Sequence, residues 1–166
     1  MTSIAGQPDD SFVHLVNENR GIAWKVARAY FAGRDDQQDI VQEMMYQLWR
    51  SYSRFSGQSK FSTWMYSVCL NTALTYRKKA DRRQSESLSE QHHAIAEQYP
   101  GREDDVALLF EAIAKLSALN KAIILLYLDD LSYEEIAGIT GLTRANVSVR
   151  LVRIKKELET YLRSII

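Results

Sequence analysis

The 166-residue sequence predicts an all-α protein of two small helical domains joined by a flexible acidic linker. Apolar residues recur with the helical period of 3.6 in both halves of the chain. Between the halves, residues 85–103 are rich in Ser, Glu, Gln and His and poor in apolar side chains. Strand-like alternation and hairpin dipeptides are missing from the sequence. We therefore expect helical domains over residues 9–84 and 104–166, with the linker between them.

Charge is distributed unevenly, although Lys and Arg balance Asp and Glu at 21 each. Residues 1–84 carry 12 basic and 8 acidic side chains, residues 85–130 carry 3 and 9, and residues 131–166 carry 6 and 4. Two basic ends around an acidic middle favour contact with a polyanion at two places. A connector rich in Glu is also simply a soluble connector.

Composition argues against a membrane, disulfide or metal protein. The single cysteine, Cys69, stands in an apolar run and is expected to be a buried small side chain. No apolar stretch approaches the roughly 18 residues of a membrane span, and residues 1–10 lack the apolar core of a signal peptide. His92 and His93 are adjacent and no further ligand stands near them. We expect a cytoplasmic protein without membrane insertion, metal or cofactor.

Helical periodicity defines the elements in order. In the first domain, apolar positions predict helices over residues 12–30, 35–52 and 61–79, the third of which finishes in a cationic run. The second helix opens on two aspartates, whose charge suits a helix N-terminus. In the second domain, the pattern covers residues 106–116 and 123–128, and two shorter helices follow.

The last two helices carry the most specific motif of the chain. Ser132 begins a capping box with the Glu three residues later, worth about 1 kcal/mol. Ala137, Gly141 and Val147 then have the spacing of a helix-turn-helix: a small residue where the helices cross, a glycine in the turn and an aliphatic residue that fixes the second helix.

The second helix of this motif would present hydrogen-bond donors, with no carboxylate before Glu157. Donors of this kind bond base edges and phosphates, and a bidentate base contact discriminates by about 1–3 kcal/mol. An ordinary helical hairpin with a solvated basic face is the alternative, and the lack of acid on this face argues against it. The candidate DNA-binding residues are Thr143, Arg144, Asn146, Ser148, Arg150 and Arg153.

In the first domain, aromatic residues from Trp49 to Tyr76 are interleaved with Arg and Lys. Unpaired bases stack on aromatic rings at about 1–3 kcal/mol each, whereas a double helix needs no such rings. The pattern therefore indicates single-strand binding. For Trp49, Phe61 and Trp64 we favour the alternative, a place in the core. The better candidates for exposed roles are Phe55, Asn71, Tyr76 and Arg77.

Several segments resemble the extracytoplasmic-function (ECF) sigma factors of the sigma-70 superfamily, bacterial initiation factors that contain regions 2 and 4 only. The resemblance covers residues 9–84 and 104–162 in family order. Similar to region 2 are residues 36–43 (DQQDIVQE), 55–66 (FSGQSKFSTWMY) and 71–74 (NTAL), and similar to region 4 are residues 131–137 (LSYEEIA) with the helix that follows.

The resemblance implies a non-enzymatic protein that binds core RNA polymerase and promoter DNA. Region 4 would contact the polymerase flap and read the minus-35 duplex through the donor face described above. Region 2 would dock on the clamp helices of the largest polymerase subunit through Asp39, Gln42, Glu43 and Tyr46. It would capture the minus-10 strand through Phe55, Lys60, Asn71, Tyr76, Arg77 and Lys78.

The chain departs from the family pattern at some positions. Ser117 stands where many members have Pro, and Ser148 stands where many have Lys. Thr75 lies near a position at which many members have Asp. Base choice depends on such side chains, so the resemblance does not extend to the promoter sequence.

Partner binding leaves a second function open. An anti-sigma factor is an expected partner, and a decoy that binds one without directing transcription is the main alternative. The retained cationic faces favour DNA binding. A one-component repressor would leave the aromatic first domain unexplained, and no phosphate loop or catalytic cluster indicates an enzyme. We expect a monomer when the chain is free.

Overall fold

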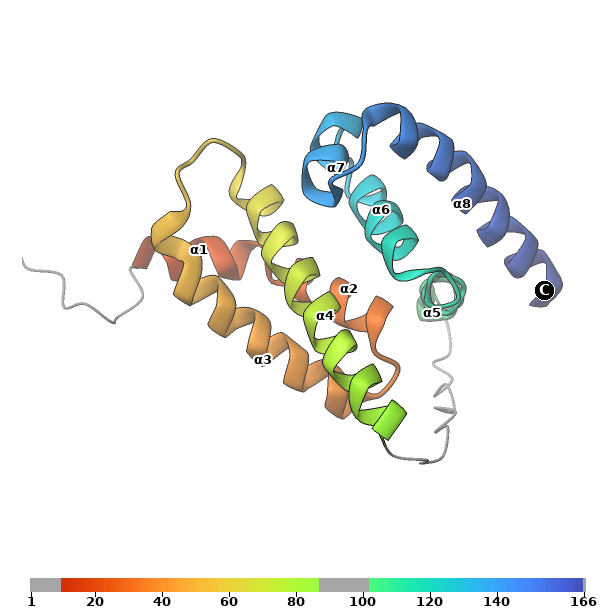
Figure 1. Ribbon diagram of the computed structural model, residues 1–166, viewed down its shortest axis with the longest axis horizontal. Coiled ribbons are helices and arrows are strands. Elements are labelled where there is room, and N and C mark those ends of the chain that lie inside the picture. The colour runs from red at the N-terminus through yellow and green to blue at the C-terminus, as the bar shows by residue number, and fades with distance from the viewer. Residues whose placement is uncertain (1–9, 87–101, 166) are drawn as a thin grey trace, which may run out of the picture.

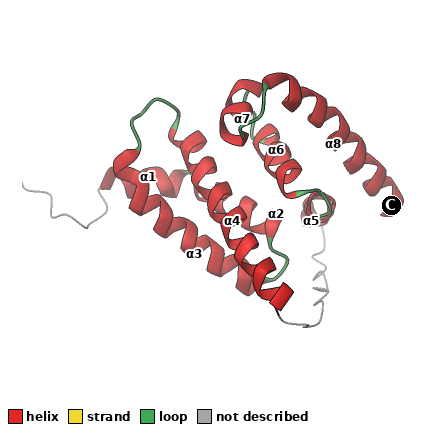
Figure 2. Ribbon diagram, viewed as in Figure 1, coloured by secondary structure: helices red, strands yellow, loops and turns green. Residues whose placement is uncertain are grey.

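The computed structural model describes residues 10–86 and 102–165, in which every regular element is helical and two bundles lie side by side (Figures 1 and 2). The first bundle comprises α1 (Asp10–Glu18), α2 (Arg20–Tyr30), α3 (Arg34–Ser51), the 3-10 helix η1 (Tyr52–Arg54) and α4 (Phe61–Glu86). The second comprises α5 (Arg102–Ala114), α6 (Ala118–Leu128), α7 (Tyr133–Thr140) and α8 (Arg144–Ile165). The predicted fold class is confirmed. No helix in these ranges has both the length and the apolar character needed to cross a bilayer.

The predicted linker lies largely outside the described residues, as do His92 and His93. Its first two residues, 85 and 86, are the last two residues of α4, and residues 102 and 103 begin α5. The helix α4 therefore runs past its cationic segment, where the sequence indicated its end. The reason is that Ala80, Arg82 and Gln84 favour helix and no Gly or Pro interrupts the segment.

The first predicted helix is in fact two. The chain leaves helical geometry at Asn19, which has φ −114° and ψ 17°. Its side-chain amide donates to the Leu15 carbonyl over 2.8 Å, so it satisfies one of the acceptors left at the end of α1. Gly21, a weak helix former, stands two residues later in the first turn of α2. Apolar spacing continues across this break, which is why periodicity alone missed it.

The core of the first bundle is formed by α2, α3 and α4. Val26, Ile40 and Met44 are fully buried, and Met65 and Cys69 face them from α4 with no exposed surface. Burial raises the pKa of the Cys69 thiol to about 12, so the thiol stays protonated. The expected role of Cys69 as a small buried side chain is confirmed.

The second bundle contains the predicted helix-turn-helix. Ser132 and Glu135 form the reciprocal capping box, with the Ser hydroxyl accepting from the Glu135 amide over 3.1 Å. Gly141 ends α7 with φ 76°, and the Thr143 hydroxyl accepts from the Asn146 amide at the start of α8. The last helix is not short as predicted, since it spans 22 residues. Its apolar period continues through Leu158, which keeps its later turns packed on the bundle.

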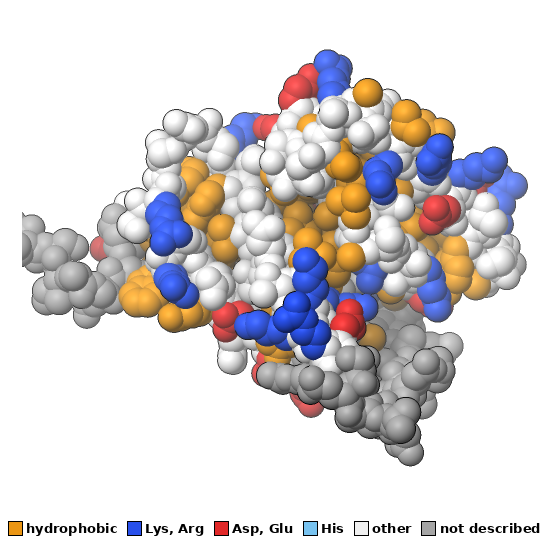
Figure 3. Space-filling model, viewed as in Figure 1, with side chains coloured by type: hydrophobic (Ala, Val, Ile, Leu, Met, Phe, Trp, Pro, Cys, Tyr) orange, Lys and Arg blue, Asp and Glu red, His pale blue; other side chains and the backbone are white. Residues whose placement is uncertain are grey.

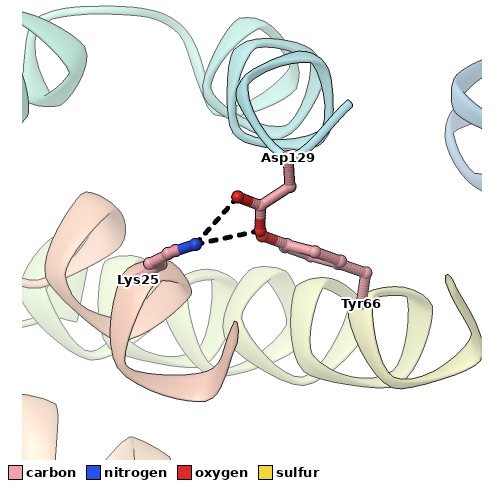
Figure 4. Close-up of polar contacts among 3 residues, drawn as sticks. All are labelled: Lys25, Tyr66 and Asp129. Carbon is pink, nitrogen blue, oxygen red and sulfur yellow. Dashed lines mark hydrogen bonds and ion pairs between the residues drawn. The ribbon is translucent and has the colours of Figure 1, made fainter. Parts of the chain in front are cut away.

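The two bundles meet along α2, which contacts α5 and α6. The Lys25 ammonium bonds both carboxylate oxygens of Asp129 over 2.8 and 3.1 Å, and the Tyr66 hydroxyl donates to the same carboxylate (Figure 4). The Tyr30 hydroxyl donates to the Ala118 carbonyl over 2.6 Å. Burial raises the pKa of this hydroxyl. The Arg28 guanidinium lies 4.5 Å from the centroid of an α5 phenyl ring.

One cation of the second bundle is enclosed by this contact. Lys121 is 6% exposed, and its ammonium lies 5.2 Å from the centroid of the Tyr30 ring. Burial, together with the positive charge of Arg77, lowers the pKa of Lys121 to about 8. At the contact between the bundles, the positive charges of Lys121 and Arg77 therefore repel each other.

The two glycines of the helix-turn-helix should respond oppositely to alanine. Gly141→Ala puts a Cβ on a residue with φ 76° and is expected to lower the free energy of unfolding by about 1 kcal/mol. Gly138 lies within α7 and a Cβ there meets nothing within 4 Å, so Gly138→Ala should raise it by about 0.5–1 kcal/mol. Urea denaturation followed by circular dichroism measures both, and changes of the same sign would contradict this assignment of the turn.

Candidate nucleic-acid and protein interfaces

The outer face of α8 is a stripe of exposed and half-exposed side chains. Asn146, Val149 and Arg153 are exposed and recur at the spacing of one helix face, with Arg150 between them and Glu157 at the end. With Asn120 of α6 they line a shallow depression. Amide, guanidinium and aliphatic groups on one face can contact adenine, guanine and a thymine methyl respectively. Val149 was not among the predicted residues, because an aliphatic side chain does not belong to the pattern of hydrogen-bond donors.

Two of the predicted DNA-binding residues, Arg150 and Ser148, are less exposed than expected. Arg150 is half-buried, and its guanidinium donates to the Asn120 side chain over 3.1 Å. Ser148 is also half-buried and lies off the stripe. Arg144 and Thr143 are exposed at the start of α8, where Arg144 pairs with Glu134 of α7 over 2.8 Å. Because this ion pair is solvated, it is weak and exchangeable for a phosphate.

A second exposed stripe follows α4. Asn71, Thr75, Lys78 and Arg82 are exposed at intervals of three or four residues, which places them on one face. Figure 3 shows Lys and Arg side chains gathered over the C-terminal half of α4 and along α8. The structure therefore brings Asn71 and Lys78 together, as predicted, in a strip that combines an amide with cations.

The other predicted residues of α4 point elsewhere. The Arg77 guanidinium donates to the carbonyl of Tyr30, at the end of α2 in the same bundle, over 2.6 Å. Tyr76 is 38% exposed and its ring meets Phe31 edge-on at 5.7 Å between centroids. Both side chains lie off the Asn71 stripe, since they are one or two residues out of its helical register.

The predicted stacking residue Phe55 belongs to an aromatic cluster. Its ring lies 5.2 Å from Trp64, 5.8 Å from Phe61 and 6.3 Å from Tyr52, between centroids. It is half-buried, while Lys60 in the same loop is exposed. The cluster fixes the two ends of the loop between η1 and α4 and so positions the backbone and cation of the loop.

The predicted protein-binding residues share one face of α3. Asp39, Gln42 and Tyr46 are exposed, and Glu43 is half-exposed with its carboxylate accepting from an amide one turn later. Trp49 continues the same face and is 41% exposed, with its ring 6.3 Å from that of Tyr46. The expectation that Trp49 is a core residue was wrong. Its spacing of seven residues from Gln42 was the signal for the outer face.

No group of three His, Cys, Asp or Glu side chains within residues 10–86 and 102–165 is arranged to hold a metal ion.

Comparison with known proteins places both bundles in one family. The model for Sigma-70 region 2 matches residues 15–83, and that for Sigma-70, region 4 matches residues 107–158. The ECF RNA polymerase sigma-E factor of Haemophilus influenzae is 31% identical over 143 residues, covering 78% of this chain and 76% of the relative. That of Escherichia coli (strain K12) is 30% identical over 166 residues, covering 92% and 86%.

Two solved structures share the fold. The sigma factor RpoE from Bartonella quintana, in complex with the anti-sigma factor NepR, superposes with a TM-score of 0.81 at 22% identity, over 93% of this chain and 98% of that one. CnrH in complex with the cytosolic domain of CnrY gives a TM-score of 0.66 at 22% identity, over 93% and 88%.

The contribution of Phe55 to stability distinguishes a packed ring from an exposed one. Phe55→Ala removes three ring contacts and is expected to lower the free energy of unfolding by about 2 kcal/mol. Tyr76→Ala, which removes one edge contact from a more exposed ring, should cost less than about 1 kcal/mol. Urea denaturation monitored by tryptophan fluorescence measures both. A larger loss at Tyr76 would contradict the packing role of Phe55.

Proposed function

The chain belongs to the ECF sigma factors of the sigma-70 family, and on this basis we propose that it binds core RNA polymerase and directs transcription initiation at specific promoters. The observation that carries the proposal is the pair of exposed polar and cationic stripes, one on α4 and one on α8. Two separate faces of this kind suit a protein that reads two DNA elements in different states, one melted and one duplex.

The α8 stripe would read the minus-35 element in the major groove. Asn146 and Arg153 are exposed donors on it, and Val149 offers an aliphatic contact for a thymine methyl. Thr143 and Arg144 stand at the N-terminus of the recognition helix, where a phosphate is favoured. Arg150 would act from the inner edge, held by Asn120. Ser148 lies off the stripe and would contribute least.

The α4 stripe and the preceding loop would hold the minus-10 strand. Asn71 offers donors and an acceptor to an unpaired base, and Lys60 and Lys78 are exposed cations for the backbone. Phe55 would act by shaping the loop. Arg77 could reach DNA only after it leaves the Tyr30 carbonyl.

The outer face of α3 would contact the polymerase clamp helices. Asp39, Gln42 and Tyr46 are exposed there, and Trp49 extends the same face with a large apolar side chain. Aromatic anchors within a polar surround are typical of protein interfaces. The second bundle would contact the flap, and the protein would act in the cytoplasm, where polymerase is found, as a monomer before it binds.

An anti-sigma factor is the second partner we propose. One solved neighbour, the sigma factor RpoE from Bartonella quintana, is bound to the anti-sigma factor NepR. A decoy that binds the inhibitor without directing transcription would need neither cationic stripe, so the exposed donors on α4 and α8 favour the initiation factor.

Run-off transcription tests the function. Core polymerase with the full chain and a genomic fragment library should yield new start sites, and Asn71→Ala with Arg77→Ala should reduce them at least tenfold. Asn71→Ala alone separates the effect of the exposed amide from that of Arg77, which also bonds the Tyr30 carbonyl. Arg20→Ala, an exposed cation of α2 away from both stripes, is the matched control and should leave the transcripts unchanged. Tight polymerase binding without any new start would favour the decoy.

Base contacts and phosphate contacts should separate in a salt titration. Lys78→Ala is expected to lower the slope of log affinity against log salt by about 0.7–0.9, because one phosphate contact is lost. Asn146→Ala should leave the slope unchanged and cost about 1–3 kcal/mol, relaxing specificity at one base pair. Fluorescence anisotropy of the holoenzyme on promoter DNA measures both. Identical slopes for the Lys78 variant and the natural chain would argue against a phosphate contact.

A further inference from the structure

Asp129 is the polar centre of the contact between the bundles. Its carboxylate accepts from Lys25 of α2 and from Tyr66 of α4, two helices of the other bundle, as Figure 4 shows. Tyr66 is 1% exposed, and the Asp129 carboxylate accepts the hydrogen bond of its buried hydroxyl. The Asp129 side chain, which belongs to the second bundle, therefore bonds residues of the first bundle.

Asp129 has little to do in its own bundle. It stands at the C-terminal end of α6, where its backbone amide bonds the Leu125 carbonyl. A carboxylate at this end of a helix is disfavoured by the helix dipole, and the Lys25 ammonium offsets this cost. Sequence and local structure thus give no reason for an acid here, and the contact between bundles does.

We propose that Asp129 is an intramolecular latch, which holds the two bundles in a closed state that cannot engage both promoter elements. The inference rests on the proposed function. The minus-10 and minus-35 elements are, by their names, about 25 base pairs apart, on the order of 60–80 Å of duplex. The longest helix, α4, has 26 residues and spans about 39 Å. Because α4 contacts α6 and α6 contacts α8, the axes of the two helices that carry the stripes lie about 20 Å apart, well short of the promoter spacing.

The latch is built to open. The Lys25 side chain is 45% exposed and that of Asp129 is 26% exposed, so water competes for the ion pair. Arg77 bonds the Tyr30 carbonyl within the first bundle and lies close enough to Lys121 of the second bundle to disfavour the positive charge of that side chain. Opening would therefore separate the positive charges of Arg77 and Lys121. The outer face of α3 lies on the far side of the first bundle from α6 (Figure 1), so polymerase can dock before or as the latch opens.

Energy transfer within the full chain tests the closed state. Dyes on Gln38→Cys in α3 and Thr160→Cys in α8 report the separation of the bundles, since both positions are exposed. Cys69 is fully buried and its thiol pKa is about 12, so it does not compete for the label. Asp129→Ala should lower the transfer efficiency measurably. Asp130→Asn, the adjacent exposed position with φ 62°, is the matched control and should not change it.

A charge exchange shows whether the contact itself is responsible. Lys25→Glu and Asp129→Lys should each lower the transfer, because each places like charges together. The double variant should recover part of the natural value. Circular dichroism melting of each variant shows that both bundles remain folded. Equal transfer in Asp129→Ala and the natural chain, or no recovery in the exchange, would overturn the latch.

Binding separates the latch from the proposed function. If closure competes with engagement, Asp129→Ala should bind core polymerase together with promoter DNA about fivefold more tightly than the natural chain, because more of the chain is competent. A loss of transfer with unchanged affinity would overturn the inhibitory role. A loss of transfer in a chain that never directs transcription would instead overturn the proposed function and leave the closed contact standing.

Discussion

Helix α2 is buried from two sides, and the placement of the other helices follows from that constraint. One face carries Ala23, Val26 and Ala27, which have no exposed surface and let α3 and α4 approach closely. The adjoining side carries Lys25 and Arg28, which meet the second bundle through a carboxylate and an aromatic ring. The same short helix is thus apolar where it forms the core of its own bundle and cationic where it meets the other.

Most of the architecture could be predicted from the sequence, because the apolar residues of an amphipathic helix recur with the helical period of 3.6. The capping box at Ser132 and the left-handed turn at Gly141 are local, so their residues suffice to place the turn. The break at Asn19 was not predictable from periodicity, since the apolar spacing runs through it. The end of α4 was placed too early because charge was taken as a stop, although Arg and Lys are good helix formers.

The site was predictable where it depends on helical register and not where it depends on distant contacts. Asn71 and Lys78 share an exposed face because they are seven residues apart. Arg77 is one residue away but bonds Tyr30, 47 residues earlier, and no local pattern encodes that pairing. Phe55 is packed by rings from both ends of its loop. For Trp49 the helical register indicated exposure, but the residue type led to the wrong prediction of a place in the core.

Electrostatics limits how tightly the two bundles can close. Both bundles carry exposed cations, so bringing them together brings like charges together. Burial is the main cause of the lowered pKa of Lys121, and the positive charge of Arg77 lowers it further. Asp129 offsets part of this repulsion with a single carboxylate shared between Lys25 and Tyr66. DNA would remove the same repulsion by supplying phosphates to the open form. If both cationic stripes bind DNA as we propose, the contact between the bundles must be weak enough to open, and the partly exposed pair of Lys25 and Asp129 meets that condition.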